Sequence, residues 1–169
     1  MLDAQWSVED NKKMTFKILY ASDLHGNEDL YNRLIEKAEE KDIKAVVLGG
    51  DLCPRRMGTL EQAISYQKDF LTNFFIPKLN ELKKDVFFIM GNDDFRVNEP
   101  LFKNLKNDNL KYINKEKFSL SDKHIVGYSF VNPTPFRLKD WEKFDDEKKK
   151  FQSRYLIMKL QPLKKKKGQ

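Results

Sequence analysis

Cysteine is nearly absent from this chain, whose 169 residues include only one, Cys53. A single cysteine excludes an intramolecular disulfide framework and is typical of proteins in a reducing compartment. No segment approaches the roughly 20 consecutive apolar residues that a membrane-spanning helix needs. Residues 1–13 are polar and carry acidic side chains, unlike a secretory signal. We therefore expect a soluble, cytoplasmic protein with no membrane partner.

Excess positive charge is missing from most of the chain, although the whole sequence has a net charge of +6. Residues 148–169 hold nine basic residues and no acidic one, whereas residues 1–147 hold 23 basic and 26 acidic residues. The sequence thus predicts a polar extension over residues 1–13, one domain over residues 14–147 and a basic tail over residues 148–169. Blocks of like charge are usually solvated, so we favour a solvated tail over one that binds nucleic acid.

Apolar segments alternate with helical patterns through the first half of the chain. Because long crossovers join the apolar segments, they predict a parallel β-α-β-α-β arrangement. Pro77 interrupts the second helix, which it kinks or splits, and Thr59 with Gln62 resembles a capping box. Shorter strand signals follow and predict hairpins of a second sheet. The strands are expected at residues 16–21, 44–48, 85–90, 110–113, 118–120 and 124–128, with helices from about residue 28 to 38, 59 to 82 and 99 to 105.

Polar side chains come directly after each of the first three predicted strands. Asp23 and His25 follow the first, Asp51 follows the second and Asn92 follows the third. Ligands of open α/β sheets bind at this carboxyl edge of the strands, and carboxylate oxygens and imidazole nitrogens are common metal ligands. Taken singly, Asp51 also fits an ion pair with a loop arginine and Asn92 fits a turn. The ordered set favours a metal site.

The stretches Asp23-Leu24-His25, Gly49-Gly50-Asp51 and Gly91-Asn92-Asp93 resemble the first three motifs of the calcineurin-like metallophosphoesterases. The resemblance covers about the first three-quarters of the chain. It implies an α/β fold in which the parallel β-α-β-α-β unit and the short strands form the first half of an α/β/β/α sandwich. It also implies a hydrolase of phosphate mono- or diesters that uses water activated by two divalent metal ions.

By the same resemblance, Asp23 and His25 would bind the first ion, Asp51 would bridge both ions and Asn92 would bind the second. Manganese is the ion we expect, with iron, zinc or magnesium as alternatives. In much of the family the residue after the asparagine is a histidine that assists the leaving group or the transferring phosphate, and here it is Asp93. Asp93 also fits a turn residue, and we include it with Asp51 and Asn92 among the predicted catalytic residues.

Histidine is the second scarce residue, because the chain has only His25 and His124. The family pattern continues with further histidine motifs that complete both metal shells, and these are absent here. The sequence therefore leaves open a truncated, catalytically impaired remnant that folds or binds metal weakly without turnover. A different doubly wound α/β protein with one magnesium ion in an acidic pocket is the third interpretation.

Overall fold

A computed structural model describes residues 5–6, 16–55, 57–103, 105, 109–135 and 138–143. Within them, five strands form the main sheet in the order β1-β2-β3-β4-β5. Strands β2 to β5 are parallel, and β1 pairs antiparallel with β2. The five strands are β1 (Gln5–Trp6), β2 (Lys17–Ala21), β3 (Ile43–Leu48), β4 (Asp85–Phe88) and β5 (Leu110–Tyr112).

Helices form each connection between neighbouring parallel strands. Helix α1 begins where the Asn27 side chain accepts a hydrogen bond from the Leu30 N–H (3.2 Å), and α2 begins at the predicted capping box of Thr59 and Gln62. A π-helical turn precedes Pro77, which has no N–H to donate to an earlier carbonyl. The connections contain α1 (Glu28–Ala38); α2 (Leu60–Phe70), η1 (Leu71–Phe75) and α3 (Ile76–Asn80); and η2 (Arg96–Asn98) and α4 (Pro100–Lys103).

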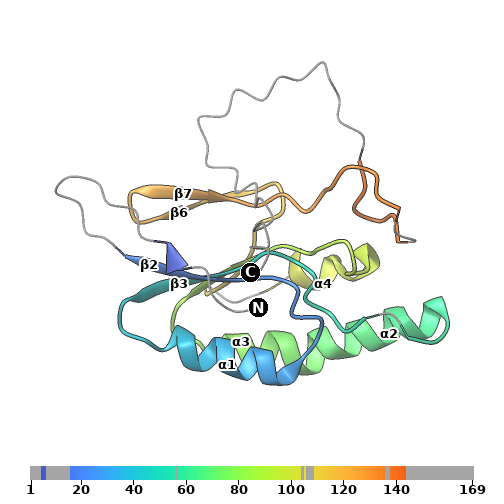
Figure 1. Cartoon of the computed structure of the whole chain (residues 1–169), viewed down its shortest axis with the longest axis horizontal. Coiled ribbons are helices and arrows are strands. Elements are labelled where there is room, and N and C mark those ends of the chain that lie inside the picture. The colour runs from blue at the N-terminus through green and yellow to red at the C-terminus, as the bar shows by residue number, and fades with distance from the viewer. Residues whose placement is uncertain are drawn as a thin grey trace, which may run out of the picture.

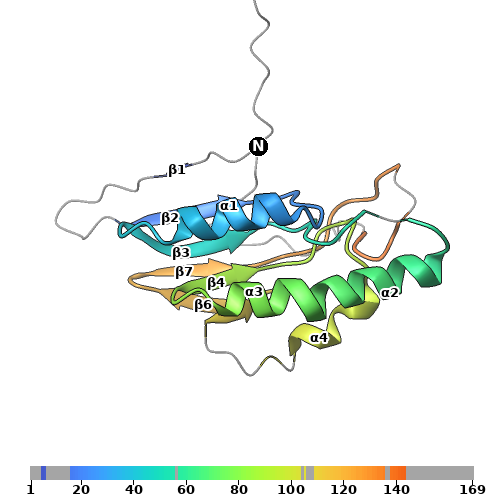
Figure 2. The same cartoon turned by 90° about the horizontal axis from the view of Figure 1, so that it is seen from below.

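The main sheet lies between a helical layer and a two-stranded sheet made of β6 (Lys117–Leu120) and β7 (Lys123–Val126) (Figures 1 and 2). Side chains of β3 alternate between the two faces: Val46 and Leu48 pack in the helix-side core, whereas Ala45 and Val47 pack in the core between the sheets. A strand buried on both faces needs a continuous apolar sequence. This explains why β3 lacks the alternation of polar and apolar residues that a half-exposed strand shows.

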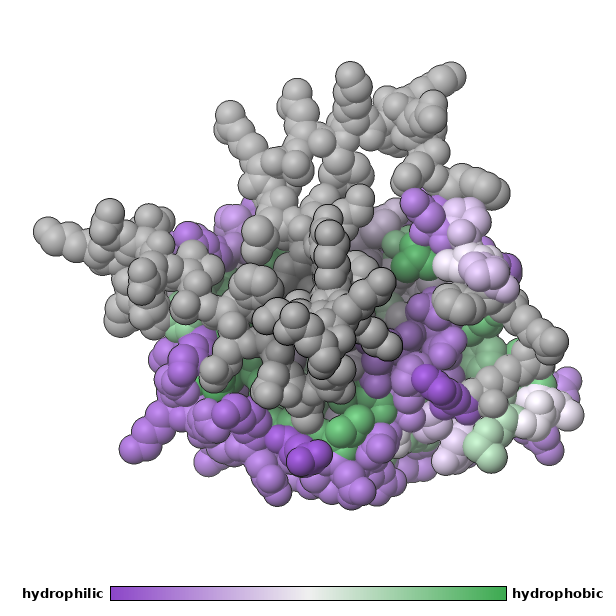
Figure 3. All heavy atoms as spheres, in the orientation of Figure 1, coloured by the Kyte–Doolittle hydropathy of each residue, from purple (hydrophilic) through white to green (hydrophobic). Residues whose placement is uncertain are grey.

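The outer face of the helical layer is polar. Glu36, Glu39 and Glu40 are exposed on or just after α1, and hydrophilic side chains line the lower rim of the molecule in Figure 3, where α1 and α3 lie.

Among the residues that the structure describes, no helix is both long and apolar enough to cross a membrane. Within the same residues, no helix covers the outer face of β6 and β7, so three layers of the expected sandwich are seen.

Two details differ from the predictions. The segment 110–113 was expected to begin the second sheet, but β5 pairs in parallel with β4 and is the fourth parallel strand of the main sheet, because the short helix α4 provides a crossover between them. Gln5–Trp6, in the extension predicted over residues 1–13, pairs with β2. The predicted basic tail, residues 148–169, lies outside the described residues.

Candidate metal centre

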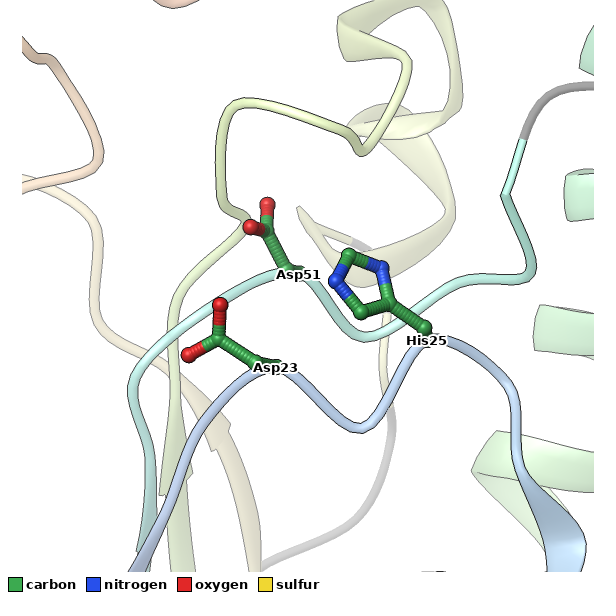
Figure 4. A group of neighbouring side chains, drawn as sticks. All are labelled: Asp23, His25 and Asp51. Carbon is green, nitrogen blue, oxygen red and sulfur yellow. The ribbon is translucent and has the colours of Figure 1, made fainter. Parts of the chain in front are cut away.

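Three of the predicted metal ligands meet at the carboxyl edge of the main sheet. Asp23 and His25 lie on the loop after β2, and Asp51 lies on the loop after β3. One ligand atom from each residue can be chosen so that all lie within 4.8 Å of one another. Figure 4 shows the two carboxylates and the imidazole ring gathered at the ends of these two loops.

Backbone hydrogen bonds hold these two loops together. The Asp23 N–H donates to the Gly50 carbonyl (3.1 Å), and the His25 N–H donates to the Asp51 carbonyl (2.9 Å). Asp23, His25 and Asp51 all have positive φ angles, of 59°, 46° and 52°. Residues other than glycine rarely adopt this left-handed backbone conformation, which costs about 1–2 kcal/mol per residue. Strained backbone of this kind is concentrated at functional sites, and here it turns three ligand side chains toward one point.

Asp51 lies in a partly buried, acidic environment. Burial raises the pKa of Asp51 from 3.8 to about 6, and the neighbouring charges of Asp94 and Asp93 add to this effect. The Asp93 N–H opposes it by donating a hydrogen bond of 2.8 Å to Asp51 Oδ1. A carboxylate that is desolvated among like charges is stabilised by a cation, so the electrostatics of this position favour a bound metal ion.

Asn92 and Asp93 lie on the loop after β4, at the same edge of the sheet. The Asn92 side-chain amide donates to Asp93 Oδ1 (3.4 Å), and Asp93 Oδ2 lies 3.8 Å from His25 Nδ1. The Asp93 side chain therefore faces the loop after β2, which carries Asp23 and His25. The roles assigned to Asn92 as a metal ligand and to Asn92 and Asp93 as catalytic residues stay predictions.

Asp94 is a structural residue that the sequence did not assign. Its buried carboxylate accepts three backbone hydrogen bonds, from the N–H groups of Leu52 (3.1 Å), Cys53 (2.8 Å) and Gly91 (2.8 Å). Burial raises the pKa of Asp94, and these three donors act in the opposite direction. Asp94 thus joins the loops after β3 and β4, which carry Asp51 and Asn92.

Gln67 on α2 is a second residue that sequence reasoning missed. Its side-chain amide donates to the carbonyls of Pro54 (3.1 Å) and Asp93 (2.8 Å), and its Oε1 accepts from the Phe95 N–H (2.8 Å). The available signal was its position: Gln67 lies one turn after Ala63 on the buried face of an amphipathic helix. A buried amide needs several hydrogen-bond partners, and here the loops after β3 and β4 provide them.

His124 and Arg96 have their contacts elsewhere. His124 is exposed near the start of β7, opposite Ser119. The Arg96 guanidinium packs over the rings of Phe130 (5.3 Å) and Trp141 (5.5 Å). It lines a hollow of about 630 Å³ beside β5 that includes none of the three clustered metal-ligand residues. The second histidine therefore does not replace the missing ligands in the described part of the site.

The residues at the strand ends fit a divalent metal ion. The three ligand atoms lie within 4.8 Å of one another, close enough for side-chain adjustments to bring them to bonds of about 2.1 Å from one ion. His25 Nδ1 is also buried without a hydrogen-bond partner in the described residues. Two carboxylates and one imidazole form a mixed oxygen and nitrogen donor set, which suits manganese, iron or zinc.

The family model of calcineurin-like phosphoesterases matches residues 16–166. The chain belongs to this family. The matched range includes the β2–β5 sheet, the three clustered ligands and the loop after β4, and it extends past residue 147, where we placed the end of the domain. A comparison with curated proteins gives no match. The chain is therefore a member of a metal-dependent phosphoesterase family and has a candidate Asp23–His25–Asp51 metal site.

Proposed function

We propose that this protein hydrolyses phosphate mono- or diesters at the carboxyl edge of the main sheet. The observation that carries the proposal is the convergence of Asp23, His25 and Asp51, three ligand residues from two strand ends, in a chain of this family. Two divalent ions, most suitably manganese, would be held by these residues and Asn92. Ions bound there supply Lewis acids for the phosphoryl oxygens and lower the pKa of a bound water.

The residues of the chain provide binding and orientation for this chemistry. Asp51 lies close to both Asp23 and His25, and its two carboxylate oxygens would allow it to hold two ions. The Asp93 N–H donates a hydrogen bond to Asp51 Oδ1 (2.8 Å) and thereby limits rotation of the Asp51 carboxylate. Asn92 provides a neutral amide, which an anionic ester approaches without the repulsion that a carboxylate would produce. Phosphate esters are therefore the substrates that we propose.

We also propose a cytoplasmic location, which the single, buried and unpaired Cys53 supports.

Hydrolysis of a generic aryl phosphomonoester and an aryl phosphodiester, with manganese added, tests this function. We expect turnover in the original chain and loss of turnover in Asp51→Asn, because an amide bridges two cations poorly. The relative rates on the two esters assign the substrate class. Equal rates in the two proteins would contradict the proposal, since the activity would then come from a contaminant or another site.

A metal-binding remnant without turnover is the second candidate function. The position of His124 favours it, because this histidine lies near the start of β7 and is not part of the Asp23–His25–Asp51 group. Metal stoichiometry measured by calorimetry separates the candidates. Two ions per chain with turnover support the enzyme, and one weakly bound ion in a folded, inactive protein supports the remnant.

A further inference from the structure

One ring nitrogen of His25 lacks the partner that metal-binding histidines normally have. His25 Nδ1 is buried and has no hydrogen-bond partner among the described residues. Figure 4 shows the other ring nitrogen, which is farther from the main chain, facing the carboxylates of Asp23 and Asp51. This other nitrogen is Nε2. Because a neutral imidazole carries one proton, a group that accepts this proton at Nδ1 leaves Nε2 with a free lone pair.

The carboxylate of Asp93 lies on the Nδ1 side of the ring. Asp93 Oδ2 is 3.8 Å from His25 Nδ1, which is longer than a hydrogen bond by about half an ångström. The backbone of Asp93 is held at both ends, since its N–H donates to Asp51 and its carbonyl accepts from Gln67. Its side chain is 40% exposed and uses Oδ1 for Asn92 (3.4 Å), so Oδ2 can turn toward the ring.

We propose that Asp93 is a positioning residue that accepts the Nδ1 proton of His25 and keeps the Nε2 lone pair directed at the metal. This inference rests on the proposed metal site. Metal-binding histidines commonly donate their other N–H to a carboxylate, which fixes the tautomer and the ring orientation. This role also gives a function to the acidic residue that follows Asn92, where much of the family has a histidine: the Asp93 carboxylate is directed at the imidazole ring of His25.

The tautomer of His25 tests the proposal in metal-free protein. Long-range ¹⁵N–¹H correlation spectra distinguish Nδ1–H from Nε2–H, and the chain has only two histidines. A His124→Gln variant assigns the two signal sets. Spectra recorded at about pH 8, above the usual histidine pKa of about 6.5, should show the Nδ1–H form of His25 in the original chain. An Nε2–H form there would overturn the proposal without any variant.

Two variants separate hydrogen bonding from charge. Asp93→Asn removes the charge but retains an acceptor oxygen, whereas Asp93→Ala removes both. We expect Asp93→Asn to retain the Nδ1–H form and Asp93→Ala to shift His25 to Nε2–H, with His124 unchanged in both. If His25 remains Nδ1–H in folded Asp93→Ala, Asp93 does not set the tautomer and the proposal is wrong.

Manganese affinity, measured by calorimetry, provides the second readout. Loss of such a partner typically weakens metal binding by about 10–100-fold, and we expect this loss in Asp93→Ala but at most a few-fold change in Asp93→Asn. Equal weakening in both variants would indicate that Asp93 acts through charge alone and would overturn the positioning role. Failure of the original chain to bind manganese would contradict the proposed function, while the metal-free spectra would still decide the hydrogen bond.

Discussion

Asp51 of the candidate centre is held in a state that is unfavourable without a cation. Burial and neighbouring acids raise the pKa of Asp51 to about 6. At neutral pH its carboxylate is therefore ionised in surroundings that favour the neutral form. A metal ion reverses this balance, so the same residue lowers stability when the site is free and raises it when an ion is bound.

Asp51→Asn should change the pH dependence of stability in a defined direction. Because the folded-state pKa is above the usual 3.8, the contribution of Asp51 is most favourable below that value and is lost as pH rises through about 6. The variant lacks this loss, so without metal it should be more stable at about pH 7.5. Allowing for partial exposure, we expect an advantage of about 1–2 kcal/mol.

Urea unfolding curves with a chelator, recorded from about pH 5 to about pH 8, measure the difference between the two proteins. Saturating manganese is the matched control: it should stabilise the original chain and leave Asp51→Asn nearly unchanged, because a ligand that binds only the folded state increases stability. A difference that stays constant across this pH range would contradict the assignment of a raised pKa to Asp51.

At the scale of elements, the ends of β3 and β4 approach so closely that a side chain cannot fit between them. A Cβ atom on Gly91 would lie 2.2 Å from Asp51 N and 2.3 Å from Asp51 Oδ1. Gly50, with φ of 101°, would place a Cβ 2.7 Å from Gly91 Cα. Glycine permits this contact, which brings the Asp51 loop against the loop that carries Asn92 and Asp93.

Gly91→Ala should therefore weaken metal binding as well as stability. The added methyl collides with backbone and with a ligand oxygen, and such overpacking typically costs about 1–3 kcal/mol. We expect a lower midpoint in thermal unfolding and at least a tenfold loss of manganese affinity, since Asp51 must move. Gly58→Ala is the control for general destabilisation: its φ is positive (70°), so an added side chain strains the backbone, but its close contact is the flexible Gln62 side chain and not a ligand residue. Manganese affinity unchanged in folded Gly91→Ala would contradict this account.

At the scale of the whole molecule, the segment 138–143 is tied to the site. Trp141 is 1% exposed, and its Nε1–H donates to the Asp94 carbonyl (2.7 Å). Its ring packs against Phe130 with centroids 5.4 Å apart. Since the Asp94 carboxylate holds the loops after β3 and β4, a residue late in the described chain supports the residues that position the ligands.

Trp141→Phe should reduce stability and metal affinity together. The lost hydrogen bond and the space left by the smaller ring are expected to lower the free energy of unfolding by about 2–3 kcal/mol. We expect a few-fold loss of manganese affinity through the Asp94 loop. Tyr66→Phe, at a residue that is 52% exposed on α2, is the control and should change stability by less than about 0.5 kcal/mol. A stability loss with no change in affinity would show that Trp141 does not support the site.

Local patterns in the sequence predicted the β-α-β-α-β order and the placement of Asp23, His25 and Asp51 directly after β2 and β3. These predictions succeeded because strand burial, helix capping and the polar residues at strand ends depend on neighbours a few residues apart. Asn92 was likewise placed correctly after β4. The ligand roles of all four residues stay predictions, and the Asn92 amide lies against Asp93 instead of the other three.

Only the tertiary structure decided which polar residues support the site. Asp94 bonds to residues 41 and 42 positions away, Gln67 spans 13 to 28 positions, and Trp141 reaches back 47 positions. No local periodicity encodes such pairs, because each depends on two strands or loops meeting at one sheet edge. The parallel pairing of β5 with β4 has the same origin. In this protein, local sequence order places the candidate ligand residues at the strand ends, and long-range hydrogen bonds hold the loops that carry them in position.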